Sequence, residues 1–228
     1  VMTGSCNVIT LNINRIVQDW IKSPLTPDEL DSGEEWANKF KQYLIPILER
    51  VYKYHIAYKT ILYDWEDAGM FTCCNAGYIH IKKLYSTIGI NGLNEAAEFL
   101  GLKVNNNKEY IEFLQLILST IKEQNALHSI NDKKRPFLFN SEVVPAESLA
   151  SKNYNWDKKD NYWVPSNRNL YNSYFFLQND TNISVLDKMY LHGNSTYQYT
   201  DGGSACHLNL EEHLSKEQYL KLIDYAIK

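Results

Sequence analysis

Strand-like and helix-like patterns alternate along this chain, and this alternation constrains its fold more than any other feature. Residues 6–13 alternate between two faces, as a strand does. From residue 34 to about 66, large apolar side chains recur every three or four positions, which predicts one long helix, kinked at Pro46. A second amphipathic helix is predicted for residues 108–124. Strands that alternate with helices in this way predict an α/β fold.

The predicted first strand places Val8, Thr10 and Asn12 on one face and apolar residues on the other. Such a face suits a barrel interior or a cleft, where polar atoms meet a ligand. Two further strands are predicted for residues 137–139 and 172–177, because both runs are rich in aromatic side chains.

Glycines mark the predicted turns. Residues 86–92 should form a turn that leads into a helix ending near Gly101, although two glycines three positions apart would also allow close approach of another backbone. Residues 195–200 and 205–210 should form a hairpin around an Asp-Gly-Gly turn.

The last predicted helix runs from a cap at Ser215 to Ile227, with Gln218 at the capping-box position.

Composition excludes several classes of protein. The 228 residues include 44% hydrophobic and 22% charged side chains, as in an ordinary globular domain. A net charge of -4 provides no basic surface for nucleic acid, and no apolar run approaches the roughly 20 residues that span a bilayer. There is no signal-peptide pattern. We therefore expect a cytoplasmic protein with neither nucleic acid nor membrane as a partner.

The histidines and cysteines do not predict a metal site. His207 and His213 lack a third ligand at suitable spacing, and the cysteines form no CxxC framework. Cys73 and Cys74 are adjacent, which is poor geometry for a disulfide between them. Reduced thiols are the simplest interpretation, with a redox role for one cysteine as the alternative.

The predicted helix start at residues 145–148 is a candidate phosphate site. A helix N-terminus has unpaired N–H groups and the positive end of the helix dipole, so it attracts anions. Pro145 has no N–H and suits the first turn, while Ser148 could add a hydroxyl. An ordinary N-cap fits the same residues.

Glu142 and Cys6 are the two candidate catalytic residues. Glu142 lies at a strand end just before the phosphate candidate, from where a carboxylate could reach a ligand's sugar. A solvated or capping carboxylate is the alternative. Cys6, with its neighbours Ser5 and Asn7, begins the first strand, where a cysteine is commonly a buried apolar residue.

Four segments together resemble the anaerobic (class III) ribonucleotide reductases. Residues 5–16, SCNVITLNINRI, resemble the strand after that family's finger loop, and residues 86–96 contain its TIGINGL segment. Residues 140–148, NSEVVPAES, match its NxExxPAE motif, and residues 201–208, DGGSACHL, match its late DGGxxxHL segment. The four occur in the family's order and span most of the chain.

The resemblance implies a fold and a reaction. It implies the second half of a ten-stranded α/β barrel, of the ribonucleotide reductase and glycyl radical enzyme type, with residues 1–228 as a partial catalytic barrel domain. The implied activity is reduction of ribonucleoside triphosphates by thiyl and glycyl radical chemistry. Formate or a thiol would be the reductant. The implied partners of the whole enzyme are a zinc ion, an activating iron–sulfur enzyme that uses S-adenosylmethionine, and a second copy in a homodimer.

The resemblance also implies residue roles. Pro145, Ala146, Glu147 and Ser148 would hold the substrate phosphates, and Glu142 would lie beside the ribose. Ser5 and Asn7 would contact substrate.

Cys6 aligns with a second redox cysteine of thiol-dependent relatives, while Ser5 lies where some formate-dependent members have an asparagine. This favours a thiol reductant.

The resemblance is incomplete. The finger-loop cysteine, the ATP-cone and the C-terminal zinc and glycyl-radical segment have no counterpart in these 228 residues. We therefore expect a fragment, inactive alone, or one piece of a split enzyme. The alternatives are a glycyl radical enzyme of another type and a non-catalytic subunit that retains the fold.

Overall fold

The computed structural model describes residues 4–23, 34–143, 145–210 and 213–227. Its four strands form one sheet in the order β1-β2-β3-β4, and all three neighbouring pairs are parallel. The strands are β1 (Gly4–Asn12), β2 (Leu84–Asn91), β3 (Leu138–Val143) and β4 (Gly203–Ser204). A parallel sheet with helical connections confirms the predicted α/β class.

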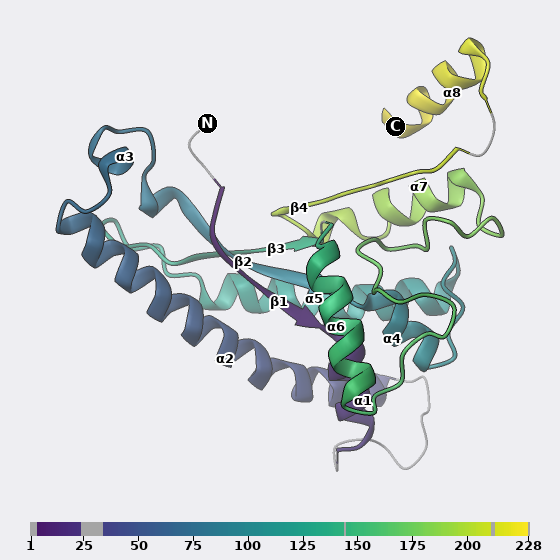
Figure 1. Ribbon diagram of the computed structural model, residues 1–228, viewed down its shortest axis with the longest axis horizontal. Helices are drawn as coiled ribbons and strands as arrows, with labels where there is room; N and C mark the ends of the chain where they lie inside the picture. Colours follow the sequence, from purple (N-terminus) through teal and green to yellow (C-terminus); the bar gives the residue numbers. More distant parts are fainter. Residues whose placement is uncertain (1–3, 24–33, 144, 211–212, 228) are drawn as a thin grey trace.

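Two long helices form the connections between the first three strands. α2 (Glu34–Asp67) lies between β1 and β2 in the chain, and α5 (Lys108–His128) lies between β2 and β3. The other helical elements are shorter: α1 (Ile13–Ile21), α3 (Thr72–Asn75), η1 (Ile81–Lys83), α4 (Leu93–Phe99), α6 (Glu147–Lys159), α7 (Val185–Gly193), η2 (Tyr197–Tyr199) and α8 (Lys216–Ile227). Figure 1 shows α6 near the carboxyl ends of the strands.

The main core lies between the sheet and the helices α2 and α5. Ile88 and Ile90 of β2 are fully or almost fully buried there, and Phe139 of β3 packs edge-on against Tyr52 of α2 with ring centroids 4.7 Å apart. Burial of such side chains stabilises the fold by roughly 1.5–3 kcal/mol each. The core therefore buries one face of the sheet, and the side chains of the opposite face are not needed for packing against α2 and α5.

The helix predictions agree well with the structure. The apolar stripe predicted from residue 34 to about 66 forms α2, which runs through Pro46. α5 continues four residues past its predicted end. The predicted C-terminal helix forms α8, and its capping box is present, because Gln218 N donates to Ser215 Oγ and Ser215 N donates to Gln218 Oε1 at 2.8 Å.

The first strand ends one residue earlier than predicted. Asn12 closes β1 and is the N-cap of α1, since its side-chain oxygen accepts a hydrogen bond from Arg15 N at 3.2 Å. Ile13 therefore begins a helix, where it is fully buried.

The turn predicted for residues 86–92 is wrong over most of its length. Residues 86–91 belong to β2, the second strand of the sheet, which pairs with β1 and β3. The reason is that Gly89 serves close packing against β1. Gly92, with a φ of 81°, makes the actual turn and begins α4, which ends just before Gly101, as predicted.

The strand predicted for residues 172–177 is also wrong. The segment is a loop, because the Asn172 side chain donates hydrogen bonds to the carbonyls of Tyr174 and Phe176 that a strand would offer to a neighbour. Its aromatic residues are buried all the same, with Phe175 and Phe176 in the main core.

The hairpin predicted for residues 195–210 does not form. Tyr197–Tyr199 is a 3-10 turn, and β4 pairs with β3 in parallel. The cause is that the Asp-Gly-Gly turn packs on β3, where Ser141 N donates to Asp201 Oδ1 at 2.9 Å and Gly202 N donates to Ser141 O at 2.8 Å.

None of the helices in the described ranges combines the length and the hydropathy that crossing a bilayer requires.

Candidate active site

The face of the sheet that points away from the main core is polar. Side chains alternate along a strand, so Thr87, Gly89 and Asn91 lie on the face opposite Ile88 and Ile90. We call this the inner face. The same alternation places Val8, Thr10 and Asn12 on it, as the sequence predicted.

One row across the inner face contains Thr10, Gly89, Glu142 and Gly203, which pair in register across all four strands. A Cβ atom on Gly89 would lie only 2.4 Å from Thr10 Oγ1, so only glycine allows this approach. Glu142 has a glycine on each side. No neighbouring side chain in the row therefore fills the space beside its carboxylate.

The environment of Glu142 suits proton transfer. The side chain is half-buried at the end of β3, and burial raises its pKa above the ordinary value for glutamate. A carboxyl group whose pKa is raised toward neutrality is a better general acid or base than a solvated one. The structure thus places the predicted carboxylate on the inner face, between two positions that have no side chain.

Ser5 belongs to a hydrogen-bonded row one step along the sheet. Thr87 Oγ1 donates to Asn140 Oδ1 at 2.7 Å, and Ser5 Oγ lies at hydrogen-bonding distance from Thr87 Oγ1. These contacts join β1, β2 and β3. Thr87 and Asn140 were not predicted as site residues, because their strand register is not visible in the sequence.

Cys6 and Asn7 lie at a β-bulge, which shifts the register between Ser5 and Asn7. Cys6 Sγ donates to Tyr85 O at 3.3 Å and lies 3.8 Å from Ser86 Oγ. Ser86 alternates with Thr87 and so faces the main core, and Asn7 pairs with it in register. Ser86 and Gly89 are about 10 Å apart along the strand. The structure therefore does not bring Cys6 beside Glu142.

The phosphate candidate is the N-terminus of α6, directly after β3. The N-cap is Ala146, and no side chain caps the helix. Pro145, Glu147 and Ser148 are exposed, whereas Ala146 is half-buried with its N–H 3.4 Å from Ser173 Oγ. An uncapped helix start can donate its first-turn N–H groups to an anion. A helix begins here as predicted, but Pro145 precedes the N-cap and lies outside the first turn in which the sequence placed it.

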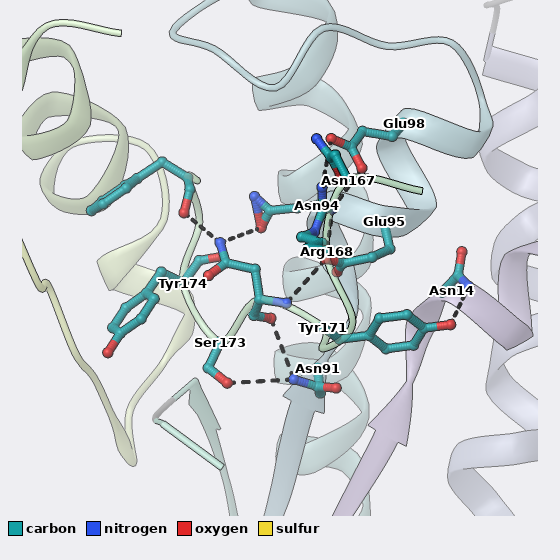
Figure 2. Close-up of polar contacts among 12 residues, drawn as sticks. Asn14, Asn91, Asn94, Glu95, Glu98, Asn167, Arg168, Tyr171, Ser173 and Tyr174 are labelled. Carbon is teal, nitrogen blue, oxygen red and sulfur yellow. Dashed lines mark hydrogen bonds and ion pairs between the residues drawn. The ribbon is translucent and has the colours of Figure 1, made fainter. Parts of the chain in front are cut away.

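Asn91 connects this helix to the sheet. It ends β2 and accepts a hydrogen bond from Asn153 Nδ2 of α6 at 3.0 Å. Its own Nδ2 donates to Asn172 O at 3.3 Å and reaches Ser173 Oγ at 3.5 Å, as Figure 2 shows. Ser173 thereby links the end of β2 to the first turn of α6. Sequence analysis missed this link because it treated Asn91 as a turn residue.

An ion-pair cluster holds the loop that carries Ser173. Arg168 pairs with the fully buried Glu95 at 2.7 Å and with Glu98 at 2.6 Å, and Asn172 N also donates to Glu95 at 3.0 Å (Figure 2). Burial raises the pKa of Glu95, and Arg168 opposes that shift. The loop is therefore fixed to α4 beside the site.

A second polar cluster holds the other end of α6. The buried Asp157 carboxylate accepts hydrogen bonds from Arg15 Nε at 2.6 Å, Asn12 Nδ2 at 2.9 Å and the Tyr171 hydroxyl at 2.5 Å. Asn12 is the last residue of β1. α6 is thus tied to the carboxyl ends of two strands, and its N-terminus has a defined direction.

The described ranges contain no group of three His, Cys, Asp or Glu side chains that could hold a metal ion.

Comparison with known proteins identifies the family. The sequence matches the family of anaerobic ribonucleoside-triphosphate reductases over residues 1–228. No curated protein matched.

Solved structures share the fold. Two structures of the anaerobic ribonucleotide reductase from Thermotoga maritima, one with glycerol in the active site and one in complex with dATP and CTP, have TM-scores of 0.79 and 0.77 at 24% identity. Each comparison covers 99% of this chain and 35% of the solved chain. A further anaerobic ribonucleotide reductase has a TM-score of 0.79 at 23% identity, with 99% of this chain and 33% of that chain covered.

This chain thus spans about a third of the length of the structures that it resembles. The likeness to them concerns the fold, whereas the family match covers every residue of the sequence. The chain belongs to the anaerobic ribonucleoside-triphosphate reductase family.

Proposed function

We propose that this chain is the substrate-holding half of the catalytic barrel of an anaerobic ribonucleotide reductase. The observation that carries the proposal is the position of Glu142, which lies between two glycines on a polar sheet face and just before an uncapped helix start. In this proposal the four parallel strands belong to one half of a ten-stranded barrel, and residues 1–228 are a partial catalytic domain. Reduction of ribonucleoside triphosphates is the proposed activity.

The first turn of α6 would bind the substrate phosphates. The N–H groups of Glu147 and Ser148 are first-turn donors that this helix start offers, and the Ser148 hydroxyl could add another. The Ala146 N–H already donates to Ser173 Oγ, so Ala146 would border the bound phosphates. Pro145 precedes the N-cap and would border the bound phosphates without donating to them. The Glu147 carboxylate would repel a triphosphate, so its neutral variant should bind the nucleotide more tightly.

Glu142 would lie beside the ribose and hold or release a proton there. Its raised pKa and its glycine neighbours support this role. Ser5 would contact the substrate from the adjacent row, because it already shares hydrogen bonds with the inner face. For Cys6 and Asn7 the support is the sequence motif, and we propose Cys6 as the reductant thiol on that ground.

The remaining parts of the proposal concern the whole enzyme. A glycyl radical, when present, supplies the radical that starts the reaction. The described part of this chain has no group of three His, Cys, Asp or Glu side chains that could bind the zinc ion implied for the whole enzyme. We further propose formate or a thiol as reductant, a radical S-adenosylmethionine activase and a second copy of the enzyme as partners. The free state of all four cysteines supports a cytoplasmic location.

The family match does not favour the two alternatives, a glycyl radical enzyme of another type and a non-catalytic subunit.

The test uses the natural polypeptide that contains this chain. Ser148→Ala should weaken binding of a ribonucleoside triphosphate about tenfold, since a hydrogen bond to a charged group contributes roughly 1.5–3 kcal/mol. Glu147→Gln should strengthen binding. Ser151→Ala, one turn further along α6, is the matched control. Equal affinity in Ser148→Ala, Ser151→Ala and the unmodified protein, measured by calorimetry, would contradict the phosphate site.

The role of Glu142 is tested by turnover. Glu142→Gln keeps the size and polarity of the side chain but cannot exchange a proton. We expect nucleotide affinity close to that of the unmodified protein and a loss of turnover of about a hundredfold or more, the usual contribution of a general acid or base. An unchanged rate would remove Glu142 from the proposed chemistry.

A further inference from the structure

The Asn140 side chain is a buried amide on the inner face that uses only part of its hydrogen-bonding capacity. The residue is 8% exposed, and its Oδ1 accepts a hydrogen bond from Thr87 Oγ1 at 2.7 Å. Its Nδ2 donates to no residue in the described ranges of the chain. Because buried polar groups are nearly always paired, an amide N–H without an acceptor at this position calls for a partner from outside the chain.

The packing around the amide fixes its position. Thr87, which is fully buried, lies directly opposite Asn140 in the strand register. Gly202 approaches the same amide so closely that a Cβ atom there would lie 2.9 Å from Asn140 Nδ2 and 3.2 Å from Asn140 Cγ. The amide is thus held between a hydrogen bond to β2 and the backbone of a glycine.

The hydrogen bonds of this row have one direction. A threonine hydroxyl has a single proton, and Thr87 gives that proton to Asn140 Oδ1. The hydrogen bond between the Ser5 and Thr87 hydroxyls must therefore be donated by Ser5. An acceptor at Ser5 and a donor at Asn140 are what the two ends of the row can offer to a ligand.

The unused donor lies next to the proposed ribose position. Asn140 and Glu142 are two residues apart on β3, so their side chains lie on the same face at a spacing of about 7 Å. Asn140 pairs with Thr87 and Glu142 pairs with Gly89, and both partners belong to the inner face. The hydroxyl oxygens of a ribose beside Glu142 can accept a hydrogen bond from an amide at this spacing.

From the buried amide, its fixed orientation and its place beside Glu142, we propose that Asn140 is a further substrate-binding residue, whose Nδ2 donates a hydrogen bond to a hydroxyl oxygen of the ribose. Thr87 is a positioning residue, because its hydroxyl holds the amide oxygen and leaves the nitrogen for the substrate. The inference rests on the proposed function, since it takes the ribose to lie beside Glu142.

Binding of CTP and of its 2′-deoxy and 3′-deoxy analogues to the natural polypeptide tests the contact. Each affinity is measured by displacement of radiolabelled CTP. Asn140→Leu keeps the size of the side chain and removes the amide, so it should lower the affinity for CTP about two- to tenfold, the usual contribution of one hydrogen bond. The analogue that lacks the contacted hydroxyl should bind the variant and the unmodified protein equally.

Asn125→Leu is the matched control. Asn125 is comparably buried, but it lies on α5 and accepts a hydrogen bond from the Tyr52 hydroxyl on the opposite side of the sheet. This variant should leave all three affinities unchanged.

Thr87 provides a second measurement that does not depend on the folding of Asn140→Leu. Thr87→Val keeps the shape of the side chain but no longer holds the amide in one orientation, so the affinity for CTP should fall. Thr87→Ser retains the hydroxyl and should retain the affinity. Equal weakening of all three nucleotides in Asn140→Leu, or unchanged CTP affinity in Asn140→Leu and Thr87→Val, would overturn the proposal and leave the proposed function intact. An unmodified protein that binds no CTP would overturn both.

Discussion

Replacing Gly89 by alanine tests whether the inner face depends on the close approach of β1 and β2. The added Cβ would lie 2.4 Å from Thr10 Oγ1, 3.1 Å from Thr10 Cβ and 3.2 Å from Thr10 Cα. Rotation of the Thr10 side chain can relieve only the first of these contacts, because the other two atoms are the backbone carbon and the first side-chain carbon. The two strands must therefore move apart in the middle of the sheet.

The cost of Gly89→Ala follows from two opposing terms. Overpacking in a dense region costs typically 1–3 kcal/mol, whereas alanine gains roughly 0.5–1 kcal/mol over glycine in backbone entropy. The clash here involves backbone and is tight, so the first term should exceed the second and leave a net loss of about 1–2 kcal/mol. Since 1.4 kcal/mol is a tenfold change in an equilibrium constant, local opening of β1 and β2 should increase about five- to thirtyfold.

Hydrogen exchange measured by mass spectrometry reports this opening for the peptides that contain each strand. Gly193→Ala is the matched control, because a Cβ there meets nothing within 4 Å and the residue is helical. We expect slower or equal exchange in that variant. If Gly89→Ala exchanged as slowly as the unmodified protein at β1 and β2, the argument that glycine is needed at this row would be refuted. Thr10→Ala together with Gly89→Ala should recover only part of the loss.

Two further predictions concern buried charge. Burial lowers the pKa of His55 to about 4, with the Thr87 backbone opposing the shift, so the unfolded chain binds a proton at higher pH than the folded one. The resulting contribution to the free energy of unfolding is complete above pH 6.5, and about 3 kcal/mol of it is lost as the pH falls toward 4. His55→Leu should therefore reduce the dependence of the urea-unfolding free energy on pH in this range. An unchanged pH dependence would contradict the assignment. Arg168→Met leaves the Glu95 charge buried without its cation and should lower the free energy of unfolding by about 3 kcal/mol. Arg168→Met together with Glu95→Leu should lower it less. A double variant as unstable as the single one would count against this account.

The helical part of the fold could be predicted from the sequence, whereas half of the sheet could not. An apolar stripe such as that of α2 extends over many turns, so any short stretch of sequence within the helix shows the helical period. β2 was mistaken for a turn because Gly89 and the following Gly92 together have the composition of a turn, and the packing role of Gly89 depends on Thr10, about 80 positions away. The buried aromatic run at 172–177 has strand-like composition, but the Asn172 side chain satisfies its carbonyls locally.

The candidate site was predicted only where its residues are neighbours in the sequence. Glu142 and the start of α6 lie within six positions of each other, so one motif contains them. The partners of that motif are distant in the chain: Gly203 beside Glu142, and Asn91 and Ser173 near Ala146. Cross-strand register brings them together, and register is not encoded in any short segment.

The row of Thr10, Gly89, Glu142 and Gly203 also has a consequence for synthesis of the protein. Its first and last members are separated by about 190 positions, so the row is incomplete until Gly203 has been made. At roughly 5–20 residues per second, this takes about 10–40 seconds on the ribosome. Until Gly203 is made, β3 lacks its neighbour β4, and a nucleotide has no finished site to bind. A nucleotide held by this row would therefore recognise only chains that have been made beyond Gly203, and it would stabilise them by mass action, by about 2.7 kcal/mol at a concentration 100 times its Kd.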